Sequence, residues 1–204
     1  LRRQRQMCIR DSNSIVPTQL CQVKYNTSYA PDFGVFEIGR VAKGLKSDGL
    51  VDEHKMLAIT LFSKTKSVEK LYFELRDMLA TFTDNIKHKS LDYAPATKAH
   101  SYEHPRNLNK IICDGRELGT IGIVHPVVSK KLDKKASIVF AEIDIQEFAQ
   151  IANSSISYEE PSKYPAMEID LSFVTDKFAP IKAAIEDAKS NLVKKIEVVD
   201  TYCD

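Results

Sequence analysis

Few residues of this 204-residue chain combine the types and the spacing that chemistry requires. His100 and His104 lie four apart with Glu103 between them, a spacing that on a helix could hold a metal ion. Pro95 lies upstream and Pro105 follows at once, so a helix is unfavourable there. No third ligand stands out nearby. We therefore expect structural histidines rather than a metal pair.

Two further residues could act as an acid or a base. Glu142 is the one carboxylate in the middle of an apolar strand, and His125 stands before Pro126. A buried acceptor of hydrogen bonds is the more common role for such a glutamate, although a perturbed carboxyl can also be catalytic. Gly39-Arg40 could form a phosphate-binding turn, but one such pair is weak evidence. The sequence holds no phosphate-loop, dinucleotide-fingerprint, nucleophile-elbow or zinc-protease motif.

A hairpin is the clearest structural pattern. The apolar runs Leu108–Cys113 and Leu118–Val124 flank Asp114-Gly115, a pair that suits the positive φ angles of a type I′ turn. Gly119 and Gly122 fall inside the second run. Glycine weakens a strand, so we expect another backbone or a partner to approach closely at these two positions.

The remaining elements follow from hydrophobic periodicity. The strongest helix runs from Ser67, a suitable N-cap, to Asn85, and its seven apolar residues form one stripe that we expect to lie on a sheet. The stripe consists of Val68, Leu71, Tyr72, Leu75, Met78, Leu79 and Phe82. We also predict helices within 14–28 and over 127–132 and 146–151, and strands over 33–41, 55–62, 91–93 and 138–143, the last central in its sheet, with a polar loop over 43–52.

Composition describes an ordinary globular protein, with 43% hydrophobic and 28% charged residues. The formal net charge of +1 is too small to indicate a general nucleic-acid surface, and the apolar runs are far shorter than the ~20 residues of a membrane helix. Residues 1–13 carry four arginines without periodicity. We interpret them as a non-native, adaptor-like segment, with a basic nucleic-acid arm as the alternative.

A linker is indicated by the polar, serine-rich run ANSSISYEEP at 152–161. Beyond it, Met167, Ile169, Leu171 and Phe173 alternate with polar residues, which predicts a half-buried strand. Pro180 opens a predicted helix, and another strand starts at Lys195.

Several motifs occur in a characteristic order. They are Phe36-Glu37-Ile38-Gly39-Arg40, His104-Pro105-Arg106, Asp114-Gly115 with Gly119 and Gly122, His125-Pro126, Val139-Phe140-Ala141-Glu142-Ile143-Asp144, Ser162-Lys163-Tyr164-Pro165-Ala166 and Asp200-Thr201-Tyr202. Together, from about Ser14 to the end, they resemble the bacterial phenylalanyl-tRNA synthetase beta subunit. The chain departs from that family in lacking a glycine before Arg106, in having Glu168-Ile169 where two basic residues are common, and in having Cys203-Asp204 where Arg-Gly is common.

The resemblance implies an α+β fold, with a class II synthetase-like antiparallel sheet flanked by helices and then a partial ferredoxin-like domain. It implies a non-catalytic core module over 14–152, a linker over 153–161 and a truncated anticodon-binding domain (strand–helix–strand) over 162–204. In a ferredoxin-like fold the first two strands are separated by the third, which is absent here, so we expect 162–204 to be marginally folded alone.

The resemblance also implies a function. The beta subunit would support ATP- and magnesium-dependent charging of tRNA(Phe) with phenylalanine by packing against a catalytic alpha subunit, as an α2β2 heterotetramer in the cytoplasm, without DNA or membrane partners. No catalytic, cofactor-binding or metal-binding residue is carried over, and Lys163 and Tyr164 are the candidate tRNA contacts. The alternatives are a free-standing RNA-binding or ligand-sensing ferredoxin-like module and a stand-alone enzyme that uses Glu142 or His125.

Overall fold

The structure is a computed structural model that describes residues 13–155 and, beyond them, residues 164, 165, 167–172, 174, 187 and 193. The chain divides into two compact units, Leu1–Ser157 and Tyr158–Asp204, and each is described by itself.

The first unit is built on a six-stranded sheet in the order β1-β2-β6-β5-β4-β3, and every neighbouring pair is antiparallel. The strands are β1 (Asp32–Leu45), β2 (Val51–Ser63), β3 (Asp92–Pro95), β4 (Glu103–Cys113), β5 (Arg116–Val124) and β6 (Ser137–Asp144). The helices are α2 (Val16–Asn26), α3 (Val68–Lys87), α4 (Pro126–Leu132) and α5 (Ile145–Gln150). The predicted α+β architecture with an antiparallel sheet flanked by helices is confirmed, as is the central position of β6.

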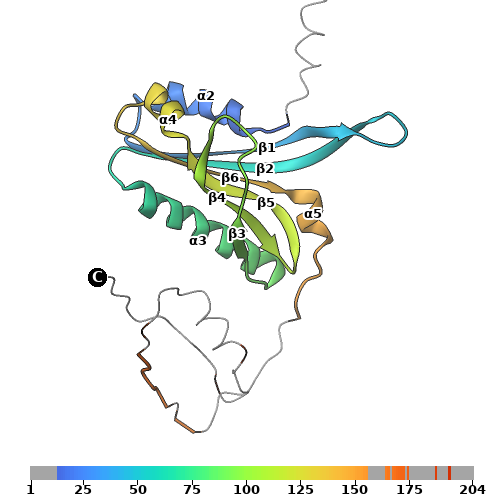
Figure 1. The fold of residues 1–204 in the computed structure, drawn as a ribbon, viewed down its shortest axis with the longest axis vertical. Helices are drawn as coiled ribbons and strands as arrows, with labels where there is room; N and C mark the ends of the chain where they lie inside the picture. Colours follow the sequence, from blue (N-terminus) through green and yellow to red (C-terminus); the bar gives the residue numbers. More distant parts are fainter. Residues whose placement is uncertain are drawn as a thin grey trace, which may run out of the picture. The chain divides into compact units, whose positions relative to one another are not determined.

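Helices cover the two faces of the sheet (Figure 1). On one face, α2 and α4 pack over a core that includes Val23, Phe62 and Phe140. On the other face, α3 and α5 pack over a second core that includes Leu75, Ile121 and Phe148. Because β6 contributes alternate residues to both cores, all its side chains except that of Ser137 are buried, as its nearly unbroken apolar run predicts.

The hairpin and its glycines are as predicted. Asp114 and Gly115 both have positive φ angles, 54° and 75°, as a type I′ turn requires. A Cβ atom at Gly119 would lie 1.9 Å from the carbonyl oxygen of Glu142 on the neighbouring strand β6. At Gly122 it would lie 3.1 Å from the carbonyl oxygen of Asn107. Another backbone therefore approaches both glycines, which explains why the strand tolerates them.

The long helix α3 begins at its predicted N-cap, where the Ser67 hydroxyl accepts a hydrogen bond from the Lys70 N–H at 3.2 Å. Leu71, Leu75 and Leu79 are buried against the sheet. Met78 is a correction, because 51% of its surface is exposed although the stripe predicts it to be buried. Periodicity tells which side of a helix a residue lies on, and it does not tell whether another element covers that residue.

Strands β1 and β2 are longer than predicted. The segment 43–52, which we expected to be a polar loop, continues both strands as an arm that projects beyond the rest of the sheet (Figure 1). Only a tight turn closes it, in which Lys46 N–H donates to the Leu50 carbonyl at 2.8 Å. Gly44 and Gly49 have positive φ angles of 145° and 79°, and no atom would meet a Cβ there within 4 Å.

The second unit corrects one prediction. Residues 167–172 form no strand, and Ile169 and Leu171 are 72% and 71% exposed. Alternation alone does not make a strand, because a strand is stable only when its backbone groups pair with a neighbour. The helix predicted after Pro180 and the strand predicted from Lys195 lie outside the described residues, except for Asp187, which is helical, and Val193.

Candidate functional site

The outermost strand β1 carries two large apolar side chains that the chain leaves uncovered. Phe36 is 75% exposed and Ile38 is 53% exposed, and alternation places both on one face of the strand. We call this pair the β1 strip. Alternation predicts that these two residues share a face, but it does not predict that this face is the exposed one.

The strip is exposed because the helix layer on its side stops short of β1. Phe36 pairs with Ile59 and Ile38 with Leu57, so the strip lies on the same face as α3 and α5. Those two helices pack over β2, β5 and β6. The sheet face over β1 therefore ends in apolar surface where a soluble domain normally carries polar residues.

The arm also carries exposed apolar side chains. At its tip, Leu45 is 73% exposed, Leu50 is 65% exposed and Val51 is 41% exposed. At the start of the arm, Arg40, for which the sequence weakly indicates a phosphate-binding turn, donates to Glu53 on β2 at 3.1 Å, so its guanidinium is engaged with the neighbouring strand.

A buried carboxylate fixes the base of the arm. Asp144, at the end of β6, accepts hydrogen bonds from Lys43 Nζ at 2.9 Å and from the His54 ring, while its other oxygen caps α5 through Gln146 N–H at 3.0 Å. Burial raises the pKa of Asp144, but the hydrogen bonds from Lys43, from the Glu147 backbone and from His54 outweigh burial and hold it below its ordinary value. This cluster joins the base of the arm to β6 and α5, and no local pattern in the sequence indicates it.

Glu142 has the structural role that the sequence favours. Its carboxylate accepts a hydrogen bond from the Ile15 N–H at 2.7 Å and so caps the start of α2. Burial raises the pKa of Glu142, although bonds from Ile15 and Ser14 act in the opposite direction. Beside it, Ser14 Oγ and Tyr102 OH share a hydrogen bond of 2.8 Å. These groups are occupied in joining α2 to the sheet, which leaves no substrate-facing acid or base here.

The three histidines of the sequence analysis are also occupied by the fold. His104 Nδ1 accepts from the N–H groups of Arg106 and Asn107, each at 3.1 Å, and His125 Nδ1 accepts from Val127 N–H at 3.2 Å and caps α4. The ring of His100 stacks on Tyr102 at 5.2 Å. Within the described residues, no three His, Cys, Asp or Glu side chains converge as a metal site.

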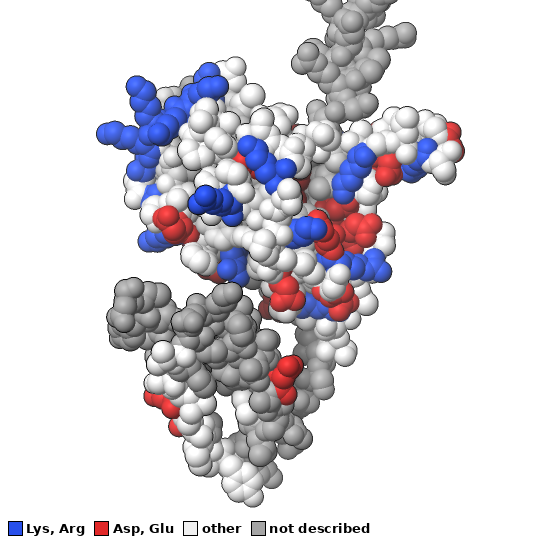
Figure 2. Space-filling model, viewed as in Figure 1, with Lys and Arg blue, Asp and Glu red and all other residues white. Residues whose placement is uncertain are grey.

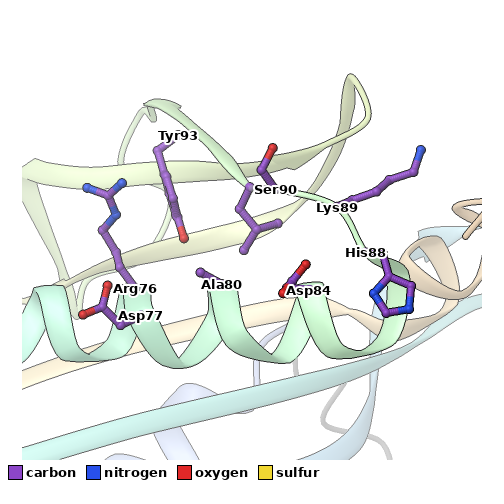
Figure 3. Close-up of a pocket in the computed structure, with 9 residues that line it drawn as sticks. Arg76, Asp77, Ala80, Asp84, His88, Lys89, Ser90 and Tyr93 are labelled. Carbon is purple, nitrogen blue, oxygen red and sulfur yellow. The ribbon is translucent and has the colours of Figure 1, made fainter. Parts of the chain in front are cut away.

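An open cavity of about 350 Å³ lies between α3 and the β3 edge (Figure 3). Its wall includes Arg76, whose guanidinium lies 4.2 Å from the centre of the Tyr93 ring, and the carboxylates of Asp77 and Asp84. Lys89 is already paired with Asp114 at 2.7 Å. The mixed charges of this cavity favour no single class of ligand.

Of the two candidate tRNA contacts, Lys163 lies outside the described residues. Tyr164 is 83% exposed. In the part of the chain described here, no helix is both long enough and apolar enough to span a membrane.

Comparison with known sequences finds a family. Residues 8–145 match the model of the phenylalanyl tRNA synthetase beta chain CLM domain. The phenylalanine–tRNA ligase beta subunit of Bacillus subtilis (strain 168) is 26% identical over 204 residues, which cover 93% of this chain and 25% of the relative. That of Geobacillus kaustophilus is 31% identical over 115 residues, 55% of this chain and 14% of the relative. The chain spans about a quarter of the length of the curated relatives that it matches over most of its own length.

Comparison with solved structures supports the fold. The structure of the pyrrolysyl tRNA synthetase PylSc of Desulfitobacterium hafniense superposes with a TM-score of 0.51 and 16% identity, over 72% of this chain and 55% of that chain. At this identity the similarity concerns the fold alone.

Proposed function

This chain belongs to the family of the phenylalanyl tRNA synthetase beta chain CLM domain, and on that premise we propose that it is part of a phenylalanine–tRNA ligase beta subunit. In this proposal the chain has no active site of its own. It supports the charging of tRNA(Phe) with phenylalanine by holding a catalytic alpha subunit and by helping to position the tRNA. The relatives named above are all ligase beta subunits, which gives the free-standing alternative no support.

We propose that the β1 strip is a contact surface for the alpha subunit. The observation that carries this proposal is the exposure of Phe36 and Ile38 on a face whose other strands are covered. Apolar side chains in such a position favour burial against a partner, since each Å² removed from water contributes roughly 25 cal/mol. The arm tip extends the surface, and the anchoring of Asp144 holds it in place before the partner arrives.

The remaining roles follow from the same proposal. ATP and magnesium act on the alpha subunit of the whole enzyme, an α2β2 heterotetramer of the cytoplasm, and none is expected to bind this chain. The hydrogen bonds of Glu142 and His125 to backbone N–H groups support this division of labour, because both residues are occupied by the fold.

The second unit is proposed to be the start of a ferredoxin-like anticodon-binding domain. Its limits are proposed as 162–204, after a core over 14–152 and a linker over 153–161, with 1–13 not native to the protein. Lys163 and Tyr164 stay the candidate tRNA contacts. The exposure of Tyr164 is compatible with stacking on a nucleotide base.

Co-expression tests the alpha-subunit contact. The tagged chain is expressed with the alpha subunit of a phenylalanine–tRNA ligase, and the amount of alpha subunit that co-purifies is measured for the wild type, for Phe36→Glu with Ile38→Glu, and for a matched control. The control is Phe73→Glu with Ile86→Glu on α3, where the same two residue types are 55% and 44% exposed. We expect the strip variant to lose most of the alpha subunit and the control to retain it.

Three outcomes separate the claims. If the wild type retains no alpha subunit, the proposed function is overturned. If both variants lose it equally, the contact is not at the strip. If the strip variant loses it while its thermal unfolding stays that of the wild type, the strip is the docking surface.

A further inference from the structure

Four lysines gather at one end of the first unit. Lys130 and Lys131 lie in the last turn of α4, and Lys134 and Lys135 lie in the turn that leads into β6. All four side chains are exposed. Figure 2 shows basic side chains gathered over the part of the first unit where Figure 1 labels α4. We call these residues the α4 lysine cluster.

The cluster is not neutralised by its surroundings. The carboxylate between the two pairs, Asp133, is engaged with Lys64 at 3.1 Å and with the Lys135 backbone N–H at 2.9 Å. These hydrogen bonds keep the pKa of Asp133 below its ordinary value. In the described part of the chain, none of the four ammonium groups lies within ion-pair distance of a carboxylate. The whole chain has a net charge of only +1, so this is a local concentration of positive charge.

A role in stabilising α4 explains only two of the four lysines. Lysines in the last turn of a helix stabilise it through the helix dipole, which explains Lys130 and Lys131. Lys134 and Lys135 lie beyond the helix and receive no such benefit. The segment is also held firmly, because His125 caps α4 and Ser129 Oγ donates to the Ala136 carbonyl at 3.0 Å. The four charges are therefore presented by an ordered surface rather than by a loose tail.

We propose that the α4 lysine cluster binds the sugar-phosphate backbone of RNA, and that the RNA is the tRNA on which the ligase acts. This inference rests on the proposed function, and it adds a contact surface remote in sequence from Lys163 and Tyr164. Lysine ammonium groups bind phosphates as point charges without reading the bases, so the contact positions the RNA and does not select its sequence.

The surroundings of the cluster favour RNA over a membrane. A helix that binds at a lipid surface needs a broad exposed apolar face beside its basic face. Helix α4 has seven residues, and its apolar residues Val128 and Leu132 pack into the core, which leaves only Val127 exposed.

Salt-dependent binding tests the proposal. The 204-residue chain is titrated into a labelled tRNA(Phe) transcript at 50–300 mM KCl, as wild type and with all four lysines replaced by Gln. The matched control replaces four exposed lysines elsewhere by Gln, namely Lys46, Lys55, Lys70 and Lys98. We expect the cluster variant to bind at least about tenfold more weakly at low salt, with a salt slope smaller by roughly 0.7–0.9 for each phosphate that the variant no longer neutralises. The control should bind less than about threefold more weakly than the wild type, and Lys→Arg at all four cluster positions should restore binding.

The outcomes are distinct. Equal losses in the two Gln variants would mean that net charge alone governs binding, and absence of binding by the wild type would also overturn the proposal. Binding to phosphatidylserine vesicles that matches tRNA binding and is lost in the same variant would assign the cluster to membranes instead. Since α4 and the β1 strip lie on opposite faces of the sheet, co-purification of the alpha subunit should be unchanged in the cluster variant. This proposal and the proposed function can therefore fail separately.

Discussion

The centre of the sheet and its β1 edge are built from similar residues in different surroundings. At the centre, Phe140 of β6 is fully buried, and its ring lies 5.2 Å from that of Tyr102 in an edge-on contact. At the edge, Phe36 of β1 has the same side chain with three quarters of its surface exposed. The glycines and buried carboxylates of the central strands are explained by contacts within the chain. The exposed apolar side chains of β1 are not explained by such contacts, and this difference points to a partner.

The largest expected effect separates these two phenylalanines. Phe140→Ala removes a fully buried ring and leaves a cavity, which should lower the free energy of unfolding by about 3–5 kcal/mol. Phe36→Ala should change it by less than about 0.5 kcal/mol, because the ring makes little contact in the free chain. Urea unfolding followed by circular dichroism measures both. A decrease above about 1 kcal/mol at Phe36 would break the comparison, since it would mean that the chain itself uses the strip.

Two glycines extend the comparison. A Cβ at Gly119 would lie 1.9 Å from a backbone carbonyl oxygen, which cannot move without separating β5 from β6. At Gly34, on β1, it would lie 2.8 Å from a methyl group at the end of the Leu61 side chain, which can rotate away. We expect Gly119→Ala to cost about 3 kcal/mol and Gly34→Ala less than about 1 kcal/mol. Similar costs in the same unfolding assay would show that the edge is packed as rigidly as the centre.

Sequence patterns predicted the structural features that depend only on residues close together in the sequence. The Asp114-Gly115 turn, the Ser67 cap and the stripe of α3 are determined within one element, and the two strand glycines correctly indicated a close backbone. Such patterns do not show whether another helix or strand packs over a given residue. Met78 fits the stripe by period and is nevertheless exposed.

The same reason explains the other failures. The alternation at Met167–Phe173 is typical of a strand, yet 167–172 form none, because period does not supply a neighbouring strand. The cluster of Lys43, His54 and Asp144 joins residues far apart in the sequence and has no local signal. For the candidate site, the alternation placed Phe36 and Ile38 together, and only the structure revealed their exposure.

The third prediction concerns pH and the buried carboxyl of the centre. Because the pKa of Glu142 is raised in the folded chain, the folded state binds the proton more tightly than the unfolded state. The stabilisation that protonation gives is complete below the unfolded value near 4.5 and is lost as pH rises through the raised pKa. Glu142→Gln removes this dependence, so the variant should gain stability relative to the wild type as pH rises above 4.5.

Unfolding in urea at a series of pH values from about 4 to about 7 measures the difference between the two proteins. The subtraction is necessary because Asp32, Asp133 and Asp144 have lowered pKa values and give the opposite slope, with stability lost as pH falls. These three carboxyls contribute equally to both proteins and cancel. A difference that is constant with pH would show that Glu142 titrates alike in the folded and unfolded states.

The smallest expected effect lies at the edge. Arg40 and Glu53 form a pair on the face of the β1 strip, with side chains 77% and 54% exposed. Exposed pairs contribute little in water, so a double-mutant cycle with alanine in the free chain should give a coupling below about 0.5 kcal/mol. If the alpha subunit covers this face, water leaves the pair and the coupling in the complex should rise several-fold. The same cycle, measured through alpha-subunit affinity, therefore tests the edge without altering its apolar residues. A coupling that stays the same in both states would place the docking surface elsewhere.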